Sequence, residues 1–227
     1  MLCSSYCSMK MLSYYIFLFL FLFEADDSSA QKKLNIELFT GLPYNLSLPL
    51  KISQAGEPDL YLTAKFNSQP FNIPIFWVWR ISYWNDNSAW ELEAVHHKLF
   101  LANKPAEVHE FSISHGLNLI TVNRGWNLSS FILRIGAGIA LAHPETTIRN
   151  QTLTEDGGIF HWGYYLSGPA FLFSAGKEFY ITGNLYVTCE ARINSSYAYI
   201  PIKNGNAGLY NISVQFIFGA GFNFLKL

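Results

Sequence analysis

Cysteine is scarce in this chain. Three occur in 227 residues, at Cys3, Cys7 and Cys189. The first two precede an N-terminal apolar run, so Cys189 stands alone once that segment is removed. A lone cysteine excludes an internal disulfide, and a small exported domain without one needs another source of stability. Neither early cysteine lies at the end of the apolar run, which argues against a lipid-modified N-terminus.

Charge and long apolar runs are also scarce. Asp, Glu, Lys and Arg make up 14% of the residues, and the formal net charge is -1. Without a basic stripe, nucleic acid is excluded as an expected partner. Beyond residues 1–30, no uncharged apolar run reaches the roughly 18 residues of a membrane-spanning helix. The sequence also has no Cys-x-x-Cys, phosphate-binding loop or His-Glu-x-x-His, so neither a cofactor nor a metal is predicted.

What the sequence does contain is alternation, most clearly near its C-terminus. From Asn211 to Phe224 every second residue is apolar, while polar or small residues fill the intervening positions except at Ile217. A period of two indicates an extended strand. The segment is longer than an ordinary soluble strand, whereas a tilted membrane-spanning strand needs about nine to eleven residues. We therefore predict the closing strand of a transmembrane antiparallel up-and-down β-barrel.

Alternation recurs along the rest of the chain and predicts an all-β fold of roughly eight to ten strands. The count depends on Asn35–Ser53, which adds two strands if it breaks at Gly41-Leu42-Pro43 and is otherwise an N-terminal extension outside an eight-strand barrel. The predicted connections include long ones at Ala198–Ala207 and His143–Gly158 and a short one at Asn123–Asn127. Bacterial barrels have short periplasmic turns and longer outer loops, so this asymmetry favours such a barrel.

The N-terminus has the features of a secretory signal. Lys10 precedes the apolar run Met11–Phe23, and Ser28 and Ala30 form a small-x-small end. We predict a signal peptide over residues 1–30 and a barrel domain over 31–227. The alternative is an uncleaved N-terminal anchor, although the run is short for a spanning helix.

With a signal, alternating strands and an aromatic-ended last strand, the chain resembles small bacterial outer-membrane β-barrel proteins. Its end departs from that class, because Leu225-Lys226-Leu227 follow Phe224. The resemblance implies a Gram-negative outer membrane, insertion by the barrel-assembly machinery, and outer-membrane lipids and lipopolysaccharide as partners. A small-molecule ligand is left unidentified.

Charged residues on the polar faces of the predicted strands suggest a buried network. A narrow barrel is filled by its own side chains, so we expect them to form ion pairs in the lumen rather than to line a pore. Ten strands would leave a small channel. The predicted lumen network consists of Arg80, Glu91, Glu93, Arg134, Glu190 and Arg192.

His115 suggests a second kind of site. It shares a predicted face with Ile113 and Leu117, which we interpret as lipid-facing, where an ionisable group is costly. The stretch faintly resembles the His-x-Ser-Asn motif of lipid A deacylases, small barrels that use Ser, His and an acid. It departs from that motif because Leu117 stands where the serine belongs. A β-bulge would turn Ser114 to the same face, with Glu110 or Glu93 as the acid.

Metal binding is a further possibility in this region. His97 could approach His109 across the hairpin, with Glu107 or Glu110 nearby, but we interpret the histidines as a titrating outer cluster. His96 is adjacent to His97 and should point to the opposite face.

The sequence therefore predicts an outer-membrane barrel with a structural or ligand- and lipid-binding role. An outer-membrane lipid-modifying hydrolase using His115, Ser114 and Glu110 is the first alternative. A soluble periplasmic lipocalin-like binding barrel is the second. The long loop His143–Gly158, which carries His143 and Glu145, is a candidate binding surface.

Overall fold

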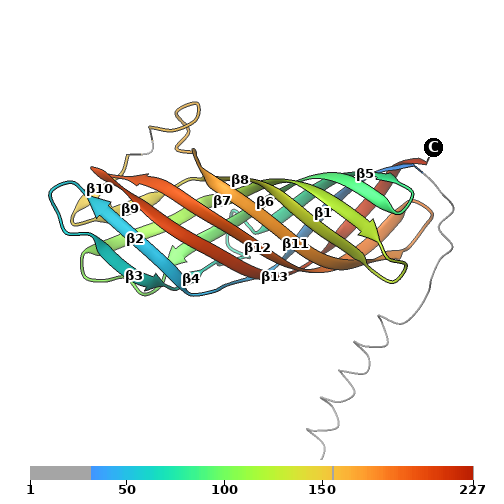
Figure 1. Cartoon of the computed structure of the whole chain (residues 1–227), viewed down its shortest axis with the longest axis horizontal. Coiled ribbons are helices and arrows are strands. Elements are labelled where there is room, and N and C mark those ends of the chain that lie inside the picture. Colours follow the sequence, from blue (N-terminus) through green and yellow to red (C-terminus); the bar gives the residue numbers. More distant parts are fainter. Residues whose placement is uncertain (1–31, 155, 227) are drawn as a thin grey trace, which may run out of the picture.

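The computed structural model describes residues 32–154 and 156–226, and these form an all-β barrel (Figure 1). Within them no helix is long and apolar enough to cross a membrane. The predicted signal peptide lies outside the described residues. One sheet of 13 strands contains a closed ring of 8, which confirms the predicted fold class. The ring is β1 (Lys33–Asn45), β5 (Trp77–Asn85), β6 (Ser88–Leu101), β7 (Val108–Asn127), β8 (Ile132–Ala142), β11 (Tyr165–Tyr180), β12 (Leu185–Ile202) and β13 (Gly205–Lys226).

The first and last strands close the ring. β1 pairs antiparallel with β13 from Lys33↔Lys226 to Asn45↔Ser213. β2 (Leu48–Gln54) then continues beside the same strand from Leu50↔Leu209 to Gln54↔Gly205. The chain does not break at Gly41-Leu42-Pro43, and the ring has 8 strands rather than ten. β1 belongs to that ring and is not an extension outside it, because it pairs with both β13 and β5. The remaining strands are β3 (Leu60–Ala64), β4 (Phe66–Asn67), β9 (Glu145–Ile148) and β10 (Gln151–Thr152).

The two ends of the barrel differ. The β5–β6, β7–β8 and β11–β12 turns lie at the end that holds the C-terminus, on the right in Figure 1. The opposite end carries the β2–β3 hairpin and the long β8–β11 connection, which includes β9 and β10. The predicted long connection at Ala198–Ala207 is wrong, because pairing continues to Ile202↔Gly205. Lys203 and Asn204 form the two-residue turn between these strands, and Asn204 adopts a φ of 58° there.

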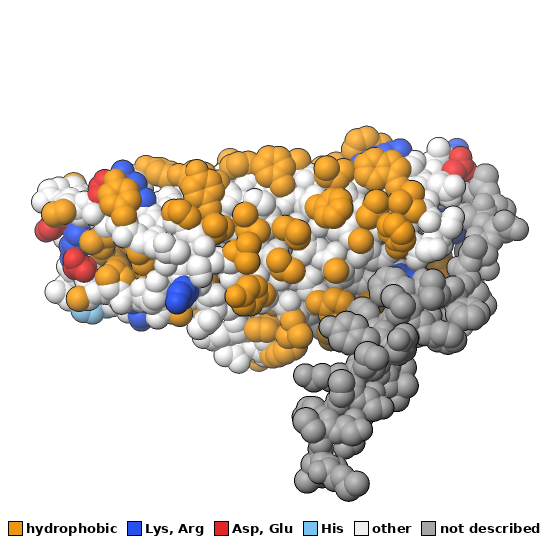
Figure 2. Space-filling model, turned by 60° about the horizontal axis from the view of Figure 1, so that its bottom comes forward, with side chains coloured by type: hydrophobic (Ala, Val, Ile, Leu, Met, Phe, Trp, Pro, Cys, Tyr) orange, Lys and Arg blue, Asp and Glu red, His pale blue; other side chains and the backbone are white. Residues whose placement is uncertain are grey.

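The outer wall is apolar and exposed. On β13 the side chains of Val214, Phe216, Phe218 and Phe222 are 41–46% exposed, whereas Gln215, between them, is buried. Figure 2 shows hydrophobic side chains spread over the middle of the barrel, with charged ones gathered toward its ends. Such a wall suits lipid, with aromatic girdles at both interfaces. It favours a membrane barrel over a soluble lipocalin-like one. The exposed girdle residues include Trp90 and Trp126 at the short-turn end, and Tyr44, Tyr199 and Tyr210 toward the other.

The lumen changes character along its length. Its half nearer the short turns is charged and polar, whereas the half nearer the long loops is a packed apolar core. The expectation that the face of Ile113 and Leu117 meets lipid is therefore wrong. A period of two separates the two faces of a strand but does not show which face points into the lumen. In this barrel the outward face is apolar, and the lumen face is apolar too in the half nearer the long loops. This core includes Leu50, Ile52, Leu99, Ile113, Leu117, Leu119, Ile200 and Leu209.

Candidate functional sites

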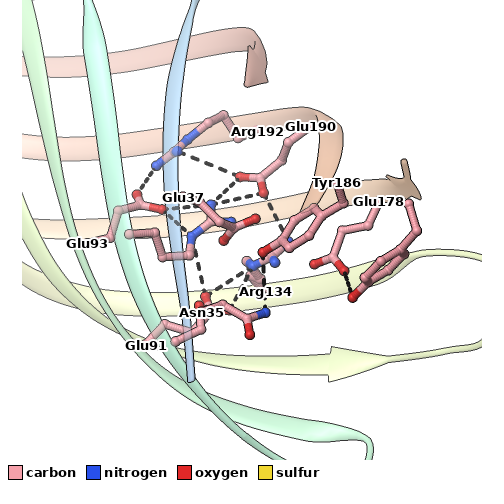
Figure 3. A network of polar contacts seen from close by, with 12 residues as sticks. Asn35, Glu37, Glu91, Glu93, Arg134, Glu178, Tyr186, Glu190 and Arg192 are labelled. Carbon is pink, nitrogen blue, oxygen red and sulfur yellow. Dashed lines mark hydrogen bonds and ion pairs between the residues drawn. The ribbon is translucent and has the colours of Figure 1, made fainter. Parts of the chain in front are cut away.

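A charged cluster lies in the half of the lumen nearer the short turns, and Figure 3 shows its contacts from close by. The structure brings together all of the residues predicted for it: Arg80, Glu91, Glu93, Arg134, Glu190 and Arg192. It adds Glu37 of β1, which sequence reasoning missed. The signal was present in Asn35 and Glu37, which alternate with apolar Ile36 and Leu38 at the start of the chain's first strand.

Arg80 is the centre of this lumen cluster. Its Nη1 donates to Glu37 Oε2 at 3.1 Å, its Nε to Glu93 Oε2 at 2.8 Å, and its Nη2 to Glu190 Oε2 at 2.9 Å. Arg134 Nε lies 3.0 Å from Glu91 Oε1 and its Nη1 lies 3.0 Å from Glu190 Oε2, so Glu190 joins the two arginines. All of these side chains are buried, and multiple charge-assisted bonds offset the cost of burying each ion.

The second site begins at a bulge in β7. Gly116 has a φ of +111°, and the β6–β7 register shifts between His97 and Leu99. A Cβ at Gly116 would lie 2.5 Å from His96 Nδ1, so a side chain there would collide with that ring. Ile113 and Leu117, on either side, both face the lumen, whereas His115 is exposed. The bulge thus turns His115 outward at the end of the barrel that carries the long loops.

Outside the wall, His115 meets the start of the long β8–β11 connection. Its Nδ1 lies 2.7 Å from Glu145 Oε1, and Ser114 Oγ also contacts that oxygen. His143 packs against the His115 ring at 4.8 Å between centroids and against Tyr164 at 5.0 Å. Tyr164 Oη donates to the carbonyl of His115 at 3.0 Å. We call Ser114, His115, His143, Glu145 and Tyr164 the histidine cluster.

The predicted acid is not the one beside His115. Glu110 is exposed and pairs with Thr147 in the β7–β9 ladder, while Glu145 contacts both Ser114 and His115. Ser114 Oγ lies 3.2 Å from His115 Nδ1, the same nitrogen that faces Glu145. In a Ser-His-acid relay the serine and the acid contact opposite ring nitrogens. Ser114, His115 and Glu145 are therefore in contact, but their arrangement is not that of a Ser-His-acid relay.

His97 and His109 lie apart from this group, whereas His96 adjoins Gly116 next to it. His97 is fully buried in the lumen and its Nε2 lies 2.9 Å from Ser68 Oγ. His96 points to the opposite face, as expected from its neighbour, where it stacks on Trp77 and its Nδ1 lies 2.9 Å from Asn118 Oδ1. His109 is exposed, and its carbonyl accepts from Lys104 Nζ at 2.7 Å.

A groove of about 730 Å³ lies on the outer wall near the β2–β3 hairpin. Tyr61, Tyr197, Tyr199 and Tyr210 line it together with Lys51. Lys51 Nζ lies 2.9 Å from Asp59 Oδ2 and 5.4 Å from the centre of the Tyr61 ring. Tyrosines at a membrane interface place their rings among acyl chains and their hydroxyls among headgroups. The groove therefore has the chemistry of an amphipathic-ligand site.

The closed ring, the apolar exterior and the charged lumen define a transmembrane β-barrel of the outer-membrane type. No protein-family model matches the chain, and the comparison with curated proteins found no match.

Comparison with solved structures found likenesses in fold. The chain is similar to OprG from Pseudomonas aeruginosa at 9% identity and a TM-score of 0.48, covering 88% of this chain and 98% of that one. It is similar to AlkL at 12% identity and a TM-score of 0.45, covering 90% and 96%. It is also similar to Ail of Yersinia pestis at 12% identity and a TM-score of 0.36, covering 86% of this chain and 99% of that one. The closed ring of 8 antiparallel strands, rather than these likenesses, bears out the expected fold of a small outer-membrane barrel.

Proposed function

We propose that the protein is a non-conducting outer-membrane barrel that holds a ligand-binding surface at its long-loop end, outside the cell. The observation that carries this proposal is the filling of the lumen. The Arg80 cluster occupies the half nearer the short turns, and the apolar core fills the half nearer the long loops. Since water and ions would have to cross both, the function belongs on the outer surface. Export by a cleaved signal and insertion by the barrel-assembly machinery are part of the proposal.

The test is electrical. The purified protein, inserted into planar bilayers and judged folded by a faster-migrating unboiled band on a gel, should give no conductance steps. A porin inserted by the same method serves as the positive control. Regular conductance steps from the wild-type protein would overturn the proposal.

The ligand we propose is lipopolysaccharide or another amphipathic molecule, held at the tyrosine-lined groove. Lys51 would meet a phosphate or carboxylate while the rings of Tyr197 and Tyr210 lie along acyl chains. Replacing Tyr197 and Tyr210 with Ala should weaken the binding of lipopolysaccharide to the protein in phospholipid vesicles. Tyr83→Ala, which removes an exposed tyrosine near the short-turn end, is the matched control and should not change that binding.

A lipid-modifying hydrolase is the second candidate, favoured by the contacts among Ser114, His115 and Glu145. Ser114 and Glu145 both contact the same ring nitrogen of His115, which counts against this candidate. Mass spectrometry of lipid A from cells expressing wild type, His115→Ala and Ser114→Ala should show the same acylation in all three. Loss of an acyl chain that depends on Ser114 would restore the hydrolase reading.

A further inference from the structure

The histidine cluster has donor atoms from three residues that converge outside the barrel wall. His115 comes from β7, His143 from the residue after β8, and Glu145 from β9. One donor atom from each lies within 4.8 Å of the others. His115 Nδ1 is 2.7 Å and His143 Nδ1 is 3.8 Å from Glu145 Oε1. Two ligand atoms that each lie about 2.0–2.1 Å from a tetrahedral Zn²⁺ ion are roughly 3.3 Å from one another. One of the two distances to Glu145 Oε1 is shorter than this separation and the other is longer.

His143 supplies an independent observation. Its side chain is buried, with 5% exposed, yet its Nδ1 has no hydrogen-bond partner among the described residues. The distance of 3.8 Å to Glu145 Oε1 is too long for a hydrogen bond. A buried ring nitrogen without a partner, aimed at a carboxylate, is the arrangement that a metal ion would satisfy.

The surroundings hold that ring in place. A Cβ at Gly163, which has a φ of +73°, would lie 2.4 Å from His143 Nε2, so the backbone of Gly163 closes the other side of the imidazole. The rings of His115 and Tyr164 pack against its faces and edges. With Nε2 against Gly163, Nδ1 is the nitrogen turned toward Glu145. The His115 side chain is exposed, which leaves a path by which an ion can enter.

From this geometry we infer that His115, His143 and Glu145 form a binding site for a divalent transition metal ion of the Zn²⁺ class. Two imidazole nitrogens and one carboxylate suit Zn²⁺, whereas Ca²⁺ and Mg²⁺ prefer oxygen ligands. The bound ion would tie β7 to the start of the long connection, on the same surface as the proposed outer function. The inference does not depend on the barrel being closed to ions or on the tyrosine-lined groove.

The test is Zn²⁺ titration of the purified full-length protein in detergent against a chromophoric chelator. Wild type should bind one equivalent. Replacing a residue that hydrogen-bonds to a metal ligand typically costs about 10–100-fold in affinity, so replacing a ligand itself should cost at least about 100-fold. His143→Ala, His115→Ala and the isosteric Glu145→Gln should each show this loss. His109→Ala removes an exposed histidine from the same strand and should bind as wild type does.

Two further measurements keep the result decisive. The gel shift between boiled and unboiled samples shows whether each variant still folds, and only folded variants are compared. Co²⁺ added in place of Zn²⁺ should give the strong visible bands of tetrahedral coordination in wild type and lose them in Glu145→Gln. Failure of wild type to bind Zn²⁺ saturably, or equal binding by folded His143→Ala, would overturn the inference.

Discussion

Glu37 of β1 and Arg80 of β5 stand directly opposite each other in the strand ladder and meet inside the lumen. Their Oε2 and Nη1 atoms are 3.1 Å apart, and their side chains are 1% and 0% exposed. Arg80 also contacts Glu93 and Glu190, so this one guanidinium joins carboxylates from three strands.

Removing Arg80 should therefore destabilise the barrel strongly. Arg80→Leu leaves Glu37, Glu93 and Glu190 buried without their shared partner, and such a loss costs about 3–5 kcal/mol. Urea unfolding of the protein in lipid vesicles, followed by tryptophan fluorescence, measures the change.

The control is Arg124→Leu, because Arg124 lies on the outer wall at 5.1 Å from the Trp90 ring and donates to Ser88, with no buried carboxylate. It should cost less than about 1 kcal/mol. The double variant Glu37→Leu/Arg80→Leu should be less than additive, since the single change at Arg80 leaves Glu37 uncompensated. Equal effects of Arg80→Leu and Arg124→Leu would contradict a central role for the cluster.

Alternation was sufficient to predict the barrel and most of its lumen charges, because lumen-facing and outward residues alternate in every strand. It could not predict the change from a charged to an apolar lumen, so Ile113 and Leu117 were assigned to the wrong face. Glu145 was missed as the partner of His115, because it comes from β9, and the β7–β9 pairing is not visible in the local pattern. The outward turn of His115 depends on the Gly116 bulge, a backbone conformation that the sequence only permits.

The Tyr186 ring packs against a glycine on the neighbouring strand. The ring can approach this closely because glycine has no side chain. Tyr186 pairs with Gly221, and a Cβ there would lie 2.2 Å from Tyr186 Cζ. The ring is fully buried, and its Oη accepts from Asn35 Nδ2 at 3.3 Å. Gly221→Ala should displace the ring and destabilise the barrel by about 1–3 kcal/mol in the same unfolding assay.

Enlarging a side chain on the outer face of the same strand provides the comparison. Ala220→Val projects into lipid and should change stability by no more than about 0.5 kcal/mol. Tyr186→Leu in the Gly221→Ala background should recover part of the loss. If Ala220→Val and Gly221→Ala cost the same, contact with Tyr186 is not the reason for the glycine.

The β2–β3 hairpin, outside the membrane-spanning part of the barrel, should show a coupled titration. The Lys51 ammonium holds the pKa of Asp59 below its ordinary value of 3.8, and the Asp59 carboxylate raises the pKa of Lys51 above 10.5. Asp59 thus contributes stability above its ordinary pKa that is lost as pH falls through its lowered folded value. Lys51 contributes stability below its ordinary pKa that is lost as pH rises through its raised value.

Carbon-13 NMR of the Asp59 carboxyl group measures this directly. Wild type should titrate below 3.8, and Lys51→Met should return the midpoint toward that value, with the contacts to Ser53 and Tyr61 keeping part of the shift. Lys65→Met, which removes an exposed lysine at the other end of β3, should leave the Asp59 titration unchanged. No response to Lys51→Met would mean that the ion pair does not persist in solution.

Cys189 offers the sharpest test of what the outer wall faces. It is the one cysteine in residues 32–154 and 156–226, it is exposed, and it pairs with Phe218 across the outer face of β12 and β13. If lipid covers this wall, a membrane-impermeant maleimide should leave Cys189 unlabelled in intact vesicles and label it after denaturation. Lys203→Cys in a Cys189→Ser background places a thiol in the β12–β13 turn and should label without denaturation. Rapid labelling of Cys189 in vesicles would mean that water, not lipid, meets the apolar wall, and the soluble lipocalin-like alternative would then return.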